Sequence, residues 1–587
     1  MKNQCKGWSM FKPSIVVLMA GFSVSAFAVG PEVISPVAFP PLFVVQSQAF
    51  SSLQGGIEPY FNKYELEDPA RAELIQGLTA ATIGPSLTTV NSKTYFQTTL
   101  GTLPVTVTKN FPGLGNAFNG SWVNQGLLPP DTNMAVGPNH VVQWVNLRLT
   151  VMDKNGTPLI GGALGYINGN AIWSALPAGS VCKISNQGDP LVAYDRLADR
   201  WVLSQFGFTL ATATNGSGTQ YPAVGSYRQC VAVSQTADPT GTYTLYEFVF
   251  PNFPDYGKIG VWPDGYYMTF NNFSYNTVTG AGSFAGASSC SFDRVKMLAT
   301  NPAASGVCFN FTNAQPFFAM LPADLDGSTP PPAGAPNYQI SPDWFFLNFG
   351  PYSIQLQKFH VDFVTPANST LSDGIGGSNG SFIKMPMPDL LGSCNDNGGS
   401  CVPQPGTTRV LDTLSMRGMY PLKYRNRGGA ESLVFTQSIK PPAPSTAAAG
   451  INFIEIRSPG ANPPVMRQNG ALAPADAISR WMGSATMDKQ GNIALGYSAS
   501  AASNVNPSIR IAGRLNSDIL SRLRGEVQVV AGTGSQTSSS GRWGDYSSMQ
   551  IDPVDDCTFW YTTEYMNNTS NSNWATQIIA FKFNSCQ

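Results

Sequence analysis

Charge is scarce in this sequence, and neither sign predominates. Only 12% of the 587 residues are charged, and 34 basic against 35 acidic residues leave a net charge of −1. Nucleic-acid-binding proteins normally carry a basic excess, and long solvated helices are rich in Glu, Lys and Arg, so the composition excludes both. A disordered chain is also excluded, because 42% of the residues are hydrophobic and 11% aromatic. The 58 glycines and 45 prolines instead predict a turn-rich β protein.

Histidine and the familiar catalytic motifs are almost absent. His140 and His360 are the only histidines, and the sequence has no C-x-x-C, G-x-S-x-G, Walker or H-E-x-x-H motif. We therefore expect no cofactor and neither a His/Cys metal centre nor a His-dependent hydrolase. Two short segments are candidates for binding a structural Ca²⁺, DTN at 131–133 and DLDG at 324–327. For DLDG the alternative is an exposed turn.

Long hydrophobic runs are absent beyond the N-terminus. Three lysines precede the apolar segment 13–25, and Ala26-Phe27-Ala28 has the A-x-A form of a cleavage site. The run falls short of the roughly 20 residues that a membrane-spanning helix needs. We predict a signal peptide over 1–28, cleaved near Ala28, a secreted protein in the periplasm or outside the cell, and no membrane span.

The cysteines predict disulfides in the exported chain. Cleavage removes Cys5, one of nine cysteines, and an even number remains, as expected of a disulfide-bonded secreted protein. Connectivity does not follow from the count, and short-range pairs are preferred. These pairs are Cys182–Cys230, Cys290–Cys308, Cys394–Cys401 and Cys557–Cys586.

The region 29–127 is expected to be irregular, with one helix. It opens on a proline-rich stretch, and EDPARAELIQGLTAA follows with Asp68 as N-cap and Pro69 at the first helical position. A strand is expected at PVTVTK, close to the end of the region.

From residue 128 onward, an apolar strand, a polar hairpin tip and a second apolar strand recur. The tips lie at Asn139, Asp199, Asp264, Asp343, Gly428, Gln490 and Asp555. Several copies continue into a second hairpin, and two hairpins supply the four strands of a β-propeller blade. We predict an all-β fold, with a β-propeller of about seven blades over 128–587 and six or eight as alternatives. A tandem of β-sandwiches is the competing architecture.

In a propeller the innermost strand of each blade lines the central channel, and ligands bind where these strands begin. At this position the repeat carries mostly charged and aromatic residues. We take these as candidate ligand-binding residues: Asp131, Asp189, Asp255, Arg417, Tyr420, Arg480, Trp481, Arg542, Trp543, Asp545 and Tyr546.

Three of these candidates are arginines from consecutive copies, Arg417, Arg480 and Arg542. Arginine binds carboxylates through a bidentate fork, so three converging arginines would hold an anionic ligand such as an acidic sugar. An aspartate could then act as acid or base, and Tyr420 or Tyr546 as a nucleophile or orienting group. The alternative is that each arginine pairs with an aspartate on a neighbouring blade and holds the ring together.

An Arg-Trp pair occurs twice, in SRWMGS at 479–484 and in GRWGDYS at 541–547. Trp481 and Trp543 stack on a sugar ring in one interpretation. In the other they pack in the core between blades.

Several of these segments resemble a group of uncharacterised secreted bacterial β-propeller proteins. The resemblance spans 128–583 and rests above all on PPDTNMAVGPNHVVQWVN and GRWGDYSSMQIDPVDDCTFWYTTEY. It implies an exported protein of a group often fused to other extracellular modules. More distantly the arrangement is similar to sialidase-like propellers, whose arginine triad implies an equivalent role for Arg417, Arg480 and Arg542.

Together these features predict a secreted, monomeric, disulfide-bonded β-propeller. Its expected role is an extracellular binding or scaffold module for glycans or surface proteins. The alternative is a sialidase-like glycoside hydrolase or lyase acting on acidic sugars.

Overall fold

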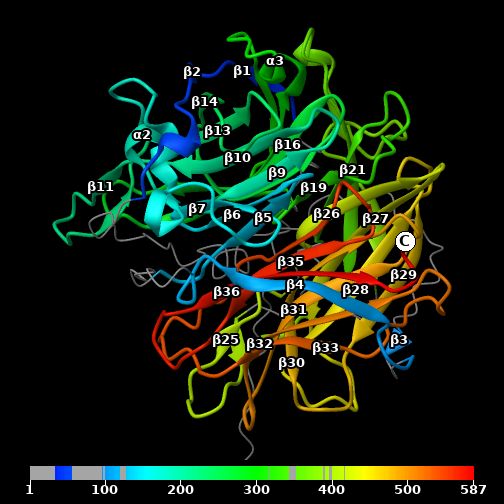
Figure 1. The fold of residues 1–587 in the computed structure, drawn as a ribbon. Coiled ribbons are helices and arrows are strands. Elements are labelled where there is room, and N and C mark those ends of the chain that lie inside the picture. The colour runs from blue at the N-terminus through cyan, green and yellow to red at the C-terminus, as the bar shows by residue number, and fades with distance from the viewer. Residues whose placement is uncertain are drawn as a thin grey trace, which may run out of the picture. The chain divides into compact units, whose positions relative to one another are not determined.

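Strands make up most of the regular structure in the computed structural model (Figure 1). The structure describes residues 34–55, 95–96, 100–118, 127–315, 317–342, 352–387, 391–394, 399–415 and 417–587. The predicted signal peptide and the predicted helix around Asp68 lie outside these residues. Within them, no helix has both the length and the apolar character to cross a membrane.

One antiparallel sheet illustrates how the sequence builds the repeated unit. It runs in chain order through β5 (Thr132–Val136), β6 (His140–Val145), β7 (Arg148–Asp153) and β8 (Ile167–Asn168). β-branched and aromatic residues favour these strands, and Gly-Pro-Asn turns the chain between β5 and β6. Every residue of β5 is buried, because other sheets cover both of its faces. A Cβ on Gly137 would lie 2.6 Å from the Trp201 ring, so the turn must be glycine there.

Two sheets repeat this meander and gain one strand each from the N-terminal segment. The first has the order β2 (Phe43–Gln46), β14 (Tyr243–Val249), β13 (Arg228–Ser234), β10 (Arg200–Gly207) and β9 (Leu191–Asp195). The second has the order β1 (Val37–Phe39), β18 (Gly306–Asn310), β17 (Gly282–Asp293), β16 (Gly265–Tyr275) and β15 (Phe253–Val261).

The next sheet joins two meanders through a parallel pairing of β19 with β26. One meander contains β19 (Leu321–Asp326), β20 (Asn337–Pro342), β21 (Ser353–His360), β22 (Thr370–Ser372) and β23 (Ile383–Pro386). The other contains β26 (Met419–Arg427), β27 (Ala430–Ile439), β28 (Gly450–Arg457) and β29 (Val465–Leu472), with β3 (Tyr95–Phe96) parallel to β29.

Two four-stranded sheets complete the chain. One contains β30 (Ser479–Met487), β31 (Ile493–Ala501), β32 (Val505–Arg514) and β33 (Val527–Gly532). The other contains β34 (Ser548–Ile551), β35 (Phe559–Tyr565), β36 (Ala575–Phe583) and β4 (Val105–Gly113).

Small elements occupy the connections between these sheets. They are the hairpins β11 (Leu210–Thr212) with β12 (Gln220–Pro222) and β24 (Ser400–Val402) with β25 (Leu411–Asp412), the helices α2 (Val181–Ile184) and α3 (Arg294–Leu298), and the 3₁₀ turns η1 (Phe50–Ser52), η2 (Gly162–Leu164), η3 (Gly169–Trp173) and η5 (Pro366–Asn368).

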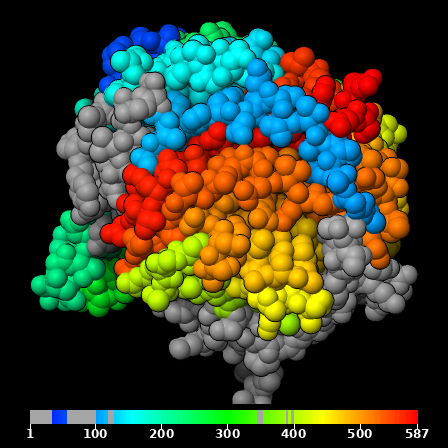
Figure 2. All heavy atoms as spheres, turned by 60° about the horizontal axis from the view of Figure 1, so that its bottom comes forward, coloured from blue at the N-terminus to red at the C-terminus, as the bar shows by residue number. Residues whose placement is uncertain are grey.

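The N-terminal segment is more regular than expected, because it adds strands to sheets built by later residues. The strand expected at PVTVTK is β4, which pairs antiparallel with the last strand, β36. In Figure 2 the blue residues of β4 lie against the red C-terminal residues. β1, β2 and β3 likewise border β18, β14 and β29. These pairings cover outer edges that would otherwise expose unpaired backbone groups.

The seven strands β5, β9, β15, β19, β26, β30 and β34, here called the first strands, contact one another in that order, and β34 contacts β5. Side chains of one first strand bond the backbone of the next. Val192 N donates to Asn133 Oδ1 at 3.0 Å, and Ser548 Oγ donates to the Met134 carbonyl at 2.8 Å. The hydrogen bonds explain why polar residues recur on strands that are otherwise apolar.

Four disulfides pair cysteines as the sequence spacing favoured. They are Cys182–Cys230, Cys290–Cys308, Cys394–Cys401 and Cys557–Cys586. Cys290 and Cys308 face each other across β17 and β18, and Cys557–Cys586 ties the chain end to the turn before β35.

A buried ion-pair network lies where the first strands end. Lys423 on β26 binds Asp324 at 2.6 Å and Asp326 at 3.5 Å, both on β19, and also donates to Gln550 Oε1 on β34 at 2.7 Å. These two aspartates form part of a strand and are buried, which corrects the exposed turn considered for DLDG. The apolar β19–β26 pairing buries them, and the lysine compensates their charge.

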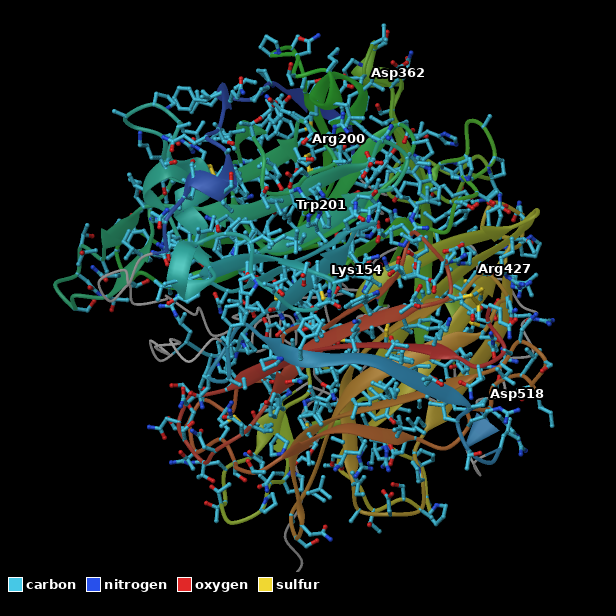
Figure 3. The ribbon with its side chains drawn as sticks, viewed as in Figure 1. Lys154, Arg200, Trp201, Asp362, Arg427 and Asp518 are labelled. Atoms are coloured by element: carbon cyan, nitrogen blue, oxygen red, sulfur yellow. A yellow bond between two sulfur atoms is a disulfide. The ribbon has the colours of Figure 1, made fainter. Side chains whose placement is uncertain are left out.

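The network extends to the hairpin tips. Arg425 Nη2 binds Asp556 Oδ1 at 2.7 Å, and Arg196 from the β9–β10 turn lies 3.6 Å from the same atom. Lys154, labelled in Figure 3, binds Asp552 at 2.7 Å and so joins the β7 and β34 turns. Residues far apart in sequence thus hold one end of the first strands together.

Candidate ligand site where the first strands begin

Four residues at the start of first strands share an unusual backbone conformation. Asp131, Asp189, Tyr256 and Asp545 have φ values of 51°, 47°, 53° and 54°. The left-handed region is disfavoured for residues other than glycine, and such strain concentrates at functional sites. Ala319 and Met482 adopt it at related places in their own copies, so the repeat imposes this conformation on the backbone, and only some copies place a charged or aromatic side chain there.

Lys258 on β15 lies at the centre of these residues. The side chain is fully buried, and Nζ donates to the Tyr256 carbonyl at 3.2 Å and to the Gly257 carbonyl at 2.9 Å. Burial lowers the pKa of Lys258 to about 7, while Asp189 and Asp545 oppose that shift. The sequence reasoning missed this residue, although a lysine inside the apolar strand KIGVW was a usable signal.

Aromatic rings separate the buried cations. Lys258 Nζ lies 3.3 Å from the Tyr256 ring centroid and 4.3 Å from that of Tyr546. Arg417 Cζ lies 4.7 Å from the Tyr256 centroid and 4.7 Å from that of Phe318. The order is therefore Phe318, Arg417, Tyr256, Lys258 and Tyr546, an alternation of cations and ring faces in which each cation contacts two rings.

Carboxylates complete the group that we call the Lys258 cluster, defined as Asp131, Asp189, Tyr256, Lys258, Arg417, Asp545 and Tyr546. The charges of Asp189, Asp545, Arg417 and Asp131 all act on the pKa of Lys258. Arg542 donates to both carboxylate oxygens of Asp545, at 2.9 and 3.0 Å. Asp189 and Arg542 are half-buried, so the cluster meets solvent beside them.

The two candidate tyrosines hold their protons tightly. Burial raises the pKa of Tyr546 well above its usual value, and Asp131 and Asp189 raise it further. Burial and Asp324 do the same for Tyr420, whose ring packs 6.2 Å from that of Tyr546. These shifts favour the neutral phenol over the phenolate at both positions.

The structure separates Arg480 from Arg417 and Arg542 by its contacts. Its guanidinium binds Asp476 at 2.9 Å and Glu526 at 2.6 Å. Glu526 precedes β33, so Arg480 is neutralised within its own sheet. Arg542 also binds an aspartate of its own copy, Asp545, at 2.9 Å.

Three other candidates are not members of the Lys258 cluster. Trp481 and Trp543 are fully buried and pack against each other with ring centroids 5.7 Å apart. Trp543 Nε1 donates to Ser498 Oγ at 3.1 Å. Their burial favours the core interpretation over stacking on a sugar. Asp255 is half-buried and directly precedes Tyr256. Burial raises the pKa of Tyr275, a residue outside the cluster, and Asp255 raises it further.

Within the described ranges, no group of three or more His, Cys, Asp or Glu side chains is arranged to hold a metal ion.

No family model matches this sequence, and no curated protein matches it. Similar solved structures include a protein of unknown function from Dyadobacter fermentans, at 9% identity and TM-score 0.33, covering 67% of this chain and 94% of that one. The polysaccharide lyase Uly1 matches at 9% identity and TM-score 0.35, with coverages of 80% and 93%. The endo-arabinase from Bacteroides thetaiotaomicron matches at 10% identity and TM-score 0.24, with coverages of 67% and 92%. At these values the function must be argued from the site itself.

Proposed function

We propose that this chain is an extracellular, closed β-propeller of seven blades that binds a glycan at the Lys258 cluster. Each blade begins with one of the first strands. Their cyclic contacts support closure, and so does the pairing of β36 with β4, which joins the two ends of the chain in one sheet. The four disulfides support an oxidising compartment.

The convergence of the cluster on Lys258 is the observation that carries the binding role. Asp131, Asp189, Arg417 and Asp545 come from different sheets or from the segments that precede them, yet all act on one buried ammonium. Carboxylates and guanidinium groups together supply the acceptors and donors that sugar hydroxyls require. Half-buried Asp189 and Arg542 give the ligand its first contacts.

Two observations favour glycan binding over an enzyme that acts on acidic sugars. An enzyme that binds a sugar carboxylate through three arginines would need Arg480 as the third. The guanidinium of Arg480 already binds Asp476 and Glu526. A tyrosine nucleophile would need a lowered pKa, whereas burial raises the pKa of Tyr420 and Tyr546.

The test is a glycan-array screen followed by calorimetry on the purified protein. Asp189→Asn removes a charge that acts on Lys258, and Asp264→Asn is the matched control, because Asp264 is also half-buried and lies in the β15–β16 turn at the other end of that strand. We expect Asp189→Asn to weaken binding about tenfold, the effect of losing about 1.4 kcal/mol, and Asp264→Asn to leave it unchanged. Absence of any glycan binding by the wild type, or equal losses in both variants, would contradict the proposal.

A further inference from the structure

Lys423 and Asp324 hold an amine and a carboxyl in direct contact inside the protein. The two residues are register partners in the parallel pairing of β19 with β26. Lys423 Nζ donates to Asp324 Oδ2 at 2.6 Å, and the two side chains are 2% and 10% exposed. The strand pairing fixes both backbones, so the two groups stay in contact for as long as the protein is folded.

The other oxygen of Asp324 faces a backbone donor. The Val261 amide on β15 donates to Asp324 Oδ1 at 3.0 Å. β15 comes this close because Gly260 has no side chain, and a Cβ there would lie 2.3 Å from the Ala323 carbonyl oxygen. A fixed N–H group stabilises the negative charge that develops on a carboxyl oxygen when a nucleophile attacks the carboxyl carbon.

A second carboxylate contacts the same amine. Asp326 Oδ1 lies 3.5 Å from Lys423 Nζ, and the Asp326 side chain is 3% exposed. The Thr486 hydroxyl donates to Asp326 Oδ2, and Arg196 Nη2 lies 3.9 Å from Oδ1. Asp326 is thus an anchored base within reach of the nitrogen, and an arginine compensates its charge.

We propose that Lys423 and Asp324 condense to an amide, a covalent cross-link between β19 and β26, with Asp326 as the general base and acid. The ion pair in the structure is the reactant of this step. The inference goes beyond the proposed function and does not depend on it, because none of these three residues belongs to the Lys258 cluster.

The reaction uses only groups that are already in contact. A proton passes from Nζ to Asp324 Oδ2, which leaves a neutral amine and a neutral carboxylic acid. The nitrogen lone pair then forms a bond to Asp324 Cγ, Asp326 takes a proton from the nitrogen and passes it to the hydroxyl, and the C–O bond breaks as water leaves. Two of the three ammonium protons leave in the water and one stays on the amide nitrogen, so atoms and charge balance. Gln550 Oε1, which accepts from Nζ at 2.7 Å, is placed to accept from that remaining N–H.

Burial favours the amide over the ion pair. An ion pair removed from water loses the solvation of both charges, and two groups held in reactive contact reach effective concentrations of about 10⁵ M or more. The amide itself carries no charge. Asp326 keeps Arg196 as a compensating cation after the reaction, so the product places no new uncompensated charge in the interior.

The cross-link constrains the chain differently from the disulfides. Asp324 and Lys423 are 99 residues apart in sequence, whereas the four disulfides span 48, 18, 7 and 29 residues. The amide joins the two meanders that share the β19–β26 pairing, and it persists under reducing conditions that open every disulfide.

Mass spectrometry of the whole purified protein tests this inference. The protein is unfolded, reduced and alkylated, which removes the disulfides, and is then digested. We expect a branched peptide that contains both Asp324 and Lys423 and is lighter than the two linear peptides together by the mass of one water molecule. Lys154 and Asp552 are the internal control, because they bind each other at 2.7 Å with the lysine 22% exposed, and their peptides should stay separate.

Three variants test the roles of the residues. Lys423→Arg keeps a cation on β26 but cannot form the amide, so the branched peptide should be absent. Asp326→Asn keeps both reacting groups and loses the base, so the cross-linked fraction after the same expression time should fall at least about tenfold. Lys154→Arg is the matched control and should cross-link as fully as the wild type.

The wild-type digest alone can overturn the inference. Separate linear peptides containing Asp324 and Lys423, without a branched one, would show that the pair remains ionic, whether or not the variants fold. A cross-link that forms equally well in Asp326→Asn would overturn the role of Asp326 as base and acid. A branched peptide in the wild type that is lost in Lys423→Arg and kept in Lys154→Arg supports the cross-link.

Discussion

Lys258 Nζ lies 3.3 Å from the centroid of the Tyr256 ring, two residues earlier on the same strand. The bulge in β15 between Asp255 and Lys258 brings the ammonium over that ring, and Tyr546 covers it from before β34. A buried cation over an aromatic face gains about 0.5–2 kcal/mol. The charge of one lysine thus links residues that are far apart in sequence.

The protonation of Lys258 should make stability depend on pH. Its pKa is about 7 in the folded protein and about 10.4 in an unfolded chain. Between these values the unfolded chain binds one more proton, so this group makes the free energy of unfolding rise with pH, by up to about 1.4 kcal/mol per unit. Urea unfolding across this window should show the rise in wild type relative to Lys258→Met. Parallel pH profiles for the two proteins would refute this assignment.

Glu564 should have the opposite effect in a different window. Burial raises its pKa well above the ordinary value in the folded protein. Its neutral form therefore contributes stability that is complete below the unfolded value of about 4.3 and is lost as pH rises through the folded pKa. Glu564→Gln cannot ionise, so its free energy of unfolding should exceed that of wild type increasingly as pH rises. A constant difference between the two proteins would contradict the shift.

Of the charges in the ion-pair network, removal of Lys423 should lower the free energy of unfolding the most. Lys423→Met leaves Asp324 and Asp326 buried without the ammonium that binds them at 2.6 and 3.5 Å. Loss of one partner from a buried ion pair costs about 3–5 kcal/mol. Lys154→Met is the control, because Lys154 is 22% exposed, and loss of its pair should cost about 1 kcal/mol or less. Chemical denaturation of both variants measures the difference, and equal losses would show that the network adds nothing.

The disulfides should contribute different amounts to the free energy of unfolding, because they close loops of different lengths. Cys182–Cys230 spans 48 residues and Cys394–Cys401 spans 7. The loop-entropy relation gives about 4 kcal/mol for the longer loop and about 2 kcal/mol for the shorter one. Replacing both cysteines of each pair by alanine should lower the free energy of unfolding in that order. The reverse order, in denaturation without reductant, would show that strain or residual structure outweighs chain entropy.

The repeated hairpins could be predicted from the sequence because a hairpin is local. Asp264 lies between β15 and β16, and Gln490 between β30 and β31, as their turn chemistry indicated. Asp343 lies outside the described residues. The partner of β4 could not be predicted, because this strand pairs with β36 at the other end of the chain. Such pairing depends on how the sheets between the two segments pack together.

The grouping of residues in the candidate site was predictable in part. Asp131, Asp189, Arg417, Asp545 and Tyr546 were found from their position before the first strands, and the structure brings them together around Lys258. Arg480 holds a similar place in the repeat but binds Glu526. A β-bulge follows Trp481, and the contacts of a side chain near such a bulge depend on the local path of the backbone.

Scarce charge and abundant glycine and proline were enough to determine a turn-rich β chain, because strand and turn preferences act over a few residues. The composition does not determine which of these few charged residues contact one another. Buried charges require partners, and the partners of Lys258, Lys423 and Arg480 come from elements that only tertiary packing brings within bonding distance. The tertiary structure therefore separated the charges that bind one another from the buried carboxyl of Glu564, whose oxygens accept no hydrogen bond of ordinary geometry within the described part of the chain.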